Sequence, residues 1–412
     1  MPLAVAVFLL AAGVAVYLHF RGGGPAPAPN VADLGASPDW SQLERYHGVL
    51  TRREFETALG NFYTLGPEWK SYFLVDSSGV AVLSARSEPV TAISFARGGE
   101  PKPAPPRPWR PASALPPAPE GRPLEGVRIA IDPGHIGGDF ARLEERWYQI
   151  GDSMPVAEGD MTLITARLLE PRLKALGAEV FLVRDRAAPV TNRRPEDFMA
   201  YARAERPGAP ETEIARFAAR LSYRTAEIRA RARIINRDGP FRPDLVLCLH
   251  FNAERWGAPD DPRFSPRNHF HIILHGAYMA AEIAHDDERF ELLHKLFQGV
   301  HLEEAAVARE VAKAFTEHTG LPAYRYPLDA PAIRIGPALW ARNLLANRLY
   351  RCPVLFLEPY VMNNREVFER VQTGDYEGLR EVAGRMRKSL YREYADAAVA
   401  GLVNYYRSAR TP

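Results

Sequence analysis

The sequence has little cysteine and almost no net charge. Only two of its 412 residues are cysteines, Cys248 and Cys352, so neither a disulfide framework nor a four-cysteine zinc site can be built. The 52 lysines and arginines nearly balance the 50 aspartates and glutamates, which leaves a net charge of +2. This balance gives no strongly basic surface, so we expect no nucleic-acid partner. No internal repeat is evident.

What is present is an ordinary globular composition with a local excess of proline. Hydrophobic residues make up 46% of the chain and charged residues 25%, values that exclude a disordered or fibrous protein. Of the 36 prolines, ten lie between Pro101 and Pro123. At about 150 residues per domain, the length indicates two to three folded units.

The N-terminal residues 1–21 are predicted to be a hydrophobic signal or anchor segment. Residues 3–20 are apolar apart from His19, and such a run is just long enough to cross a bilayer. No clear cleavage site precedes Arg21, so both a cleaved signal and a retained membrane tether stay open. The absence of a cysteine near this segment argues against a lipoprotein anchor.

Two further regions precede the main domain. Residues 38–97 are predicted to form a small α+β domain of unknown function: Thr51 and Glu54 fit a helix capping box, and two β-type runs flank the turn 76–79. Residues 98–123 are predicted to be a proline-rich linker, extended and semi-rigid.

Residues 124–412 alternate between short apolar runs and helical patterns. This alternation predicts an α/β domain with a mostly parallel sheet flanked by helices. The strands are expected at 127–131, 179–183, 244–250, 269–275 and 353–358, and the helices near 160–176, 211–237, 302–319, 336–349 and 376–407.

Four residues that can carry chemistry lie where strands end or a helix begins. His135 follows the first strand, His250 ends the third, Glu358 ends the last, and Glu158 precedes a helix. Ligands gather at the carboxyl ends of parallel strands, and a catalytic zinc takes three His or Glu ligands, leaving the remaining carboxylate as a base. A histidine after a strand is often only a turn or core residue. A carboxylate on an apolar strand, however, needs a metal, an arginine or a raised pKa.

The motifs around these residues, taken in order, resemble those of zinc-dependent N-acetylmuramoyl-L-alanine amidases of the amidase-3 type. They read I-D-P-G-H-I-G-G, Glu158 before a helix, G-A-E-V-F-L-V-R-D, R-A-R-I-I-N, D-L-V-L-C-L-H-F-N-A and L-F-L-E-P-Y-V-M-N-N. The resemblance covers roughly residues 124–407. Each motif alone is weakly specific, but six in the same order are not.

The resemblance implies a function and a set of roles. His135, Glu158 and His250 would bind Zn²⁺, and Glu358 would be the catalytic carboxylate. The reaction would be hydrolysis of the amide between N-acetylmuramic acid and L-alanine in peptidoglycan, in the cell envelope outside the cytoplasmic membrane. Arg231 and Asn236 match positions that we interpret as structural. The alternatives are a module that binds peptidoglycan without cutting it and another zinc amide hydrolase on the same scaffold.

The sequence also departs from that pattern. His135 and Glu158 lie 23 positions apart, with D-F-A-R-L-E-E-R-W-Y inserted, and further insertions near 186–224, 254–268 and 276–301 suggest lids or an altered substrate wall. His269 and His271 share one strand face, and we interpret them as part of a polar edge strand. Cys248 and Cys352 are expected to be buried free thiols, with a disulfide as the alternative.

Overall fold

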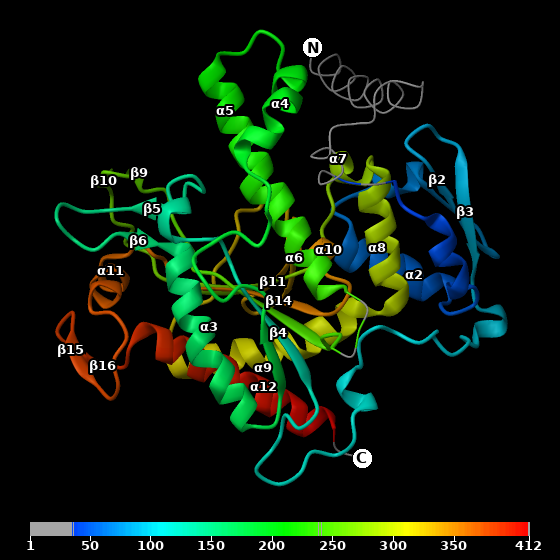
Figure 1. Cartoon of the computed structure of the whole chain (residues 1–412). Coiled ribbons are helices and arrows are strands. Elements are labelled where there is room, and N and C mark those ends of the chain that lie inside the picture. The colour runs from blue at the N-terminus through cyan, green and yellow to red at the C-terminus, as the bar shows by residue number, and fades with distance from the viewer. Residues whose placement is uncertain (1–34, 36, 238, 240, 411–412) are drawn as a thin grey trace. The chain divides into compact units, whose positions relative to one another are not determined.

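A seven-stranded sheet organises the main part of the chain in the computed structural model, which describes residues 35, 37–237, 239 and 241–410 (Figure 1). Its strands, in spatial order, are β12 (Ile333–Gly336), β13 (Leu339–Ala341), β11 (Phe270–Leu274), β14 (Val354–Pro359), β8 (Leu245–Leu249), β4 (Arg128–Pro133) and β7 (Glu179–Leu182). Strands β14, β8, β4 and β7 run parallel, whereas β11 is antiparallel to β14 and β12 is antiparallel to β13. The predicted α/β domain with a mostly parallel sheet is confirmed. The helix expected near 336–349 was wrong over its first half, where β13 lies, and the helix expected near 376–407 begins only at Leu390.

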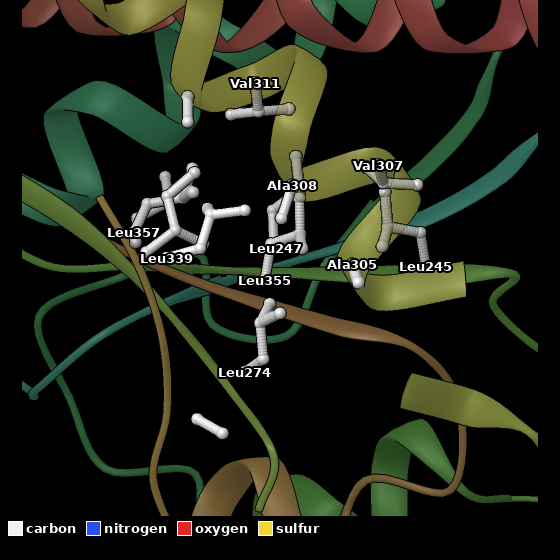
Figure 2. Close-up of a cluster of buried hydrophobic side chains, with 14 of the residues drawn as sticks. Leu245, Leu247, Leu274, Ala305, Val307, Ala308, Val311, Leu339, Leu355 and Leu357 are labelled. Carbon is white, nitrogen blue, oxygen red and sulfur yellow. The ribbon is translucent and has the colours of Figure 1, made fainter. Parts of the chain in front are cut away.

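Three long helices cover one face of this sheet: α3 (Glu158–Ala175), α9 (Val300–Thr319) and α12 (Leu390–Ala409). Figure 2 shows how α9 presents Ala305, Val307, Ala308 and Val311 to leucines of the central strands. Those leucines belong to β8, β11, β13 and β14 and are at most about 1% exposed; they are Leu245, Leu247, Leu274, Leu339, Leu355 and Leu357.

This packing decides which residues face the other side of the sheet. Successive side chains of a strand point to opposite faces, so Leu355 and Leu357 on the helical side place Glu358 on the other side. By the same alternation, Leu247 and Leu249 place His250 there. The hydrophobic pattern of the strands therefore directs these two polar residues to one common face.

Residues 38–97 contain the expected helix and hairpin. Helix α2 (Arg52–Ala58) begins with a capping box between Thr51 and Glu54, and β1 (Phe73–Val75) pairs with β2 (Gly79–Leu83) across the predicted turn. Strand β3 (Pro89–Ser94) completes a three-stranded antiparallel sheet.

The core of this N-terminal segment continues into helix α8 (Asp286–Gln298), part of the insertion at 276–301. Phe297 of α8 stacks on Tyr46, with ring centroids 5.5 Å apart, and on Phe55 at 5.8 Å. Trp40 meets Phe290 edge-on at 5.7 Å. The greater part of this insertion thus packs against the N-terminal segment. The sequence had suggested a lid or an altered substrate wall instead.

The proline-rich segment 98–123 is anchored by packing and ion pairs. Trp109 is 2% exposed and its indole donates to Gln298 at 2.9 Å. Arg110 pairs with the buried carboxylate of Asp244, with Nη2 2.6 Å from Oδ2. An extended tether was expected here, but these contacts fix the segment to the protein; the division of the chain into domains stays a prediction.

Residues 190–230 form a second compact unit, made of α4 (Met199–Glu205), α5 (Glu211–Arg220) and a π-helical turn that leads into α6 (Glu227–Ile235). Its small core holds Phe198, Ile214 and Ala218. The carboxylate of Glu227 accepts from the amides of Val190 and Thr191 and so joins the two ends of the unit.

The remaining elements are short. They are α7 (Ala280–Ile283), α10 (Leu345–Leu349), α11 (Arg365–Gln372) and the strand pairs β5 (Trp147–Tyr148) with β6 (Val156–Ala157), β9 (Gly257–Ala258) with β10 (Asp261–Pro262), and β15 (Arg380–Val382) with β16 (Arg385–Arg387). Within the described residues, no helix has the length and apolar character to span a membrane. The apolar run 3–20 lies outside them.

Candidate metal centre and active site

Three of the predicted site residues meet at one point. The Nε2 atom of His135 lies 3.2 Å from Oε2 of Glu158, and Nδ1 of His250 lies 2.9 Å from Oε1 of the same carboxylate. One ligand atom from each residue lies within 4.8 Å of the other two. Residues separated by more than a hundred positions in the chain therefore converge at the carboxyl ends of β4 and β8.

A strained turn after β4 presents His135. The backbone of His135 is left-handed, with φ of 58°, a conformation that is uncommon for a residue other than glycine. Arg231 holds this turn, because its guanidinium donates to Oδ1 of Asp132 at 2.8 Å and to the carbonyl of His135 at 2.7 Å. Tyr350 donates to the other oxygen of Asp132 at 2.6 Å. Asp132 and Arg231 are thus structural supports, and Asn236 likewise bridges main-chain groups at residues 349 and 351.

Gly134 makes room for the second histidine. A Cβ atom at this position would lie 2.3 Å from both Cε1 and Nε2 of His250, which is shorter than any real contact. Phe356 of β14 supports the other side of that ring by stacking at 4.1 Å between centroids. The His250 ring is therefore held between a glycine and an aromatic ring.

Glu158 is 2% exposed and begins helix α3. The hairpin β5–β6 delivers it, and the amide of Phe251 donates to its Oε1 at 3.2 Å. Burial alone raises its pKa, but the two histidines outweigh burial and hold the pKa of Glu158 well below its usual value. The carboxylate is therefore charged, as a metal ligand has to be.

The long spacing between His135 and Glu158 supplies two further charged groups. Glu144 is buried, accepts from the amides of Ile136 and Gly137 at 2.8 and 3.2 Å, and places Oε1 3.4 Å from Nδ1 of His135. Arg146 lies with Nε 3.3 Å from Oε2 of Glu158. Burial lowers the pKa of His135, but Glu158 and Glu144 together outweigh it and raise that pKa to about 9.

Glu358 stands beside this trio at the end of β14. Its carboxylate forms no hydrogen bond or ion pair in the part of the chain that the structure describes. Burial and the charge of Glu158 raise the pKa of Glu358 to about 8, against the lowering effects of His135, Arg146 and Arg342. The pKa of Glu158 is thus lowered, whereas the pKa of the neighbouring Glu358 is raised. This difference is typical of a site in which one carboxylate binds a metal and the other accepts a proton.

The donor set fits zinc. Two imidazole nitrogens and one carboxylate oxygen, with a fourth position open, are a common catalytic zinc set. Bonds of about 2.0–2.1 Å in a tetrahedron would hold the ligand atoms roughly 3.3 Å apart. The separations of 3.2 Å from His135 to Oε2 of Glu158 and of 2.9 Å from His250 to Oε1 are close to that value, and the three ligand atoms all lie within 4.8 Å of one another. The second nitrogen of His135 also has a carboxylate partner in Glu144, as metal-binding histidines usually do.

His269 and His271 lie near the site but not on an edge strand. Strand β11 lies between β13 and β14, inside the sheet, and both side chains are buried. The interpretation as a polar edge strand was therefore wrong: β13 and β12 extend the sheet beyond β11. His271 is the direct cross-strand neighbour of Glu358. Cys248 and Cys352 are buried free thiols, as expected.

Sequence reasoning missed the groups that come from loops. Glu144 and Arg146 lie in the inserted stretch after His135, and Arg342 follows a strand that was not predicted. The only signal for Glu144 and Arg146 was the length of the insertion, which places charged residues between two ligands.

Comparisons with known proteins add little. No family model and no curated protein matches the sequence. Solved structures that match this chain include the N-acetylmuramyl-L-alanine amidase Ami1 of Mycobacterium abscessus (17% identity, TM-score 0.37, 68% of this chain and 99% of that chain). Others are Ami1 of Mycobacterium smegmatis (16%, 0.38, 69% and 99%) and the CwlD amidase of Clostridioides difficile in complex with the GerS lipoprotein (12%, 0.38, 68% and 98%). Likenesses at this level do not identify a function.

Proposed function

We propose that this chain is a zinc-dependent hydrolase that cleaves the amide between N-acetylmuramic acid and L-alanine in peptidoglycan, and that residues 124–412 hold its catalytic machinery. The observation that carries the proposal is the convergence of His135, Glu158 and His250 within 4.8 Å, with Glu358 beside them. The ordered sequence motifs support the substrate assignment, because they place the same residue types in the order that the resemblance implies.

The residues divide the work as follows. His135, Glu158 and His250 would hold Zn²⁺, which when bound supplies a Lewis acid for the amide carbonyl and for water. Glu358 takes the proton from the attacking water and passes it to the departing amine of L-alanine. Burial and the charge of Glu158 raise the pKa of Glu358 above its usual value, which increases its affinity for a proton, as a general base requires. Glu144 fixes the orientation of His135 throughout.

Product analysis tests this function. The full-length protein is incubated with purified muropeptides, and we expect a free lactyl carboxyl on muramic acid and a new L-alanine amine, detected by mass spectrometry. Binding without any new product would support the non-cutting module. Cleavage at a different bond would support another amide hydrolase, and both results contradict our proposal.

Two variants separate chemistry from metal binding. Glu358→Gln removes the base but none of the three ligands, so we expect near-normal zinc content and amidase activity lower by at least about 100-fold. His135→Ala, the matched variant, should lose most of the zinc. Full zinc retention by a His135→Ala/His250→Ala double variant would refute the ligand assignment, and unchanged turnover in Glu358→Gln would refute the base.

We also propose that the protein acts in the cell envelope, because its substrate lies there and the apolar residues 3–20 suit an export signal or membrane tether. N-terminal sequencing of the mature protein separates the two: a start at Met1 indicates a tether, and a start near residues 22–29 indicates a cleaved signal. A fusion reporter that is active only in the cytoplasm would contradict the location.

A further inference from the structure

The face of the sheet that bears Glu358 continues past it, over β11 and β13. His271 lies directly opposite Glu358 on β11, and Trp340 lies opposite Ile273 on β13. Because Leu339 and Leu274 point to α9, strand alternation places His271 and Trp340 on the same face as Glu358. These side chains therefore form one continuous surface that extends from Glu358 on β14 across β11 to β13.

Aromatic rings from the loop after α9 form a wall on this surface. Tyr324 stacks on His269, with centroids 4.4 Å apart and planes at 29°. The hydroxyl of Tyr326 lies 3.1 Å from Nε2 of His271, and its ring meets Trp340 edge-on at 5.1 Å. We call Tyr324, Tyr326 and Trp340 the aromatic wall. These mutual contacts fix the ring positions, so the wall is preformed.

Arg342 provides a positive charge at this wall. Its guanidinium carbon lies 5.8 Å from the centroid of the Tyr326 ring, and its main chain is fixed by hydrogen bonds with Leu274 and Asn347. The side chain is half-buried, yet it makes no ion pair with any carboxylate in the described residues. His271 nearby is neutral, because burial lowers its pKa to about 3.

We propose that Arg342 binds a carboxylate of the peptide part of the substrate, with the aromatic wall beside that peptide. The half-buried guanidinium contacts Tyr326 and interacts with Glu358 at longer range, but it has no carboxylate within ion-pair distance in the described residues, so a substrate carboxylate can make a bidentate contact with it. Strands β14 and β13 are two strand spacings apart, about 10 Å, and the pairing places Arg342 four residues, about 13 Å, further along β11 than Glu358. The two backbones are therefore about 16 Å apart, which an extended peptide covers in about five residues. The carboxylate would belong to a residue of the stem peptide within that distance of the scissile amide. This inference rests on the proposed function for the identity of the peptide.

Binding and turnover of two matched muropeptides test it, one with the carboxyl groups of its stem peptide free and one with them amidated. Affinities are measured by calorimetry in the Glu358→Gln background. We expect the free form to bind about 10- to 100-fold more tightly, and Arg342→Gln to abolish that preference, while Arg342→Lys restores it in part. Arg325→Gln, an exposed arginine between Tyr324 and Tyr326 of the aromatic wall, is the control and should keep the preference.

Turnover, measured in the protein that retains Glu358, is a second test. Because the carboxylate contact lies away from the scissile bond, Arg342→Gln should raise KM for the free form but not for the amidated form. An effect of the substitution on the pKa of Glu358 would change kcat for both forms alike. Equal binding of both peptides, or a preference that survives Arg342→Gln, overturns the inference even if the amide is cleaved. Carboxylate-dependent binding lost in Arg342→Gln, without any cleavage by the natural protein, would support the inference and refute the proposed function.

Discussion

Replacing Glu144 with glutamine should weaken zinc binding while leaving the fold intact. One oxygen of Glu144 accepts from two buried amides, and the other lies 3.4 Å from Nδ1 of His135. The carboxylate thus keeps a proton on Nδ1, so that Nε2, which faces Glu158, is the nitrogen that gives up its proton when a metal binds. In Glu144→Gln the amide oxygen can still serve the backbone, but its NH₂ group then faces Nδ1. This arrangement favours the opposite tautomer, in which Nε2 carries the hydrogen.

Loss of such a partner typically costs 10- to 100-fold in metal affinity, which corresponds to about 1.4–2.7 kcal/mol. The assay is a competition titration of zinc against a chromogenic chelator, with a thermal melt of the metal-free protein as a check on folding. Asp139→Asn, an exposed carboxylate in the same loop, is the matched control and should change affinity less than about twofold. Unchanged affinity in Glu144→Gln, or an equal loss in both variants, would refute the tautomer argument.

Three further predictions concern the site and the packing around it. Gly134→Ala should displace the His250 ring, because the new Cβ would lie 2.3 Å from it, and zinc content measured by mass spectrometry should fall at least about tenfold. Phe297→Ala should destabilise the protein by about 3–5 kcal/mol in urea unfolding, since a ring that is 2% exposed loses its contacts with Tyr46 and Phe55; a change below about 1 kcal/mol would contradict the packing. Burial raises the pKa of Glu304 to about 7, against Lys295, so the folded state resists its ionisation; relative to Glu304→Gln, the natural protein should lose about 3 kcal/mol of stability as pH rises from about 4.5 to about 7, and parallel stability curves would refute this.

The sequence was sufficient for those parts of the fold that have a clear period. The apolar runs that precede His135, His250 and Glu358 are buried strands, and their parallel order brings the three residues to one rim. What could not be predicted depends on pairing between distant segments. Strands β12 and β13 are short and carry no marked alternation of polar and apolar residues. The sequence therefore did not indicate that β11 lies inside the sheet, or that His271 lies beside Glu358.

The residues that support the metal ligands could not be predicted, for a related reason. Glu144 acts through its distance to His135, which depends on the path of a loop, and loop paths follow from tertiary packing rather than from local propensity. The insertion at 276–301 was recognised by length, but nothing in its sequence indicated that Phe290 and Phe297 pack against residues near the N-terminus.

The packing of Phe55 on Phe297 has a consequence for how the chain folds during its synthesis. The two residues are separated by roughly 240 positions, and at about 5–20 residues per second the ribosome needs roughly 10–50 s to add them. For that time Phe55 has its partners Phe73 and Phe95 within the N-terminal segment but lacks the ring of Phe297. Contacts over such separations also slow folding itself. A chain shortened to begin at residue 124 would leave Phe290 and Phe297 uncovered, so the C-terminal part made alone should self-associate and aggregate.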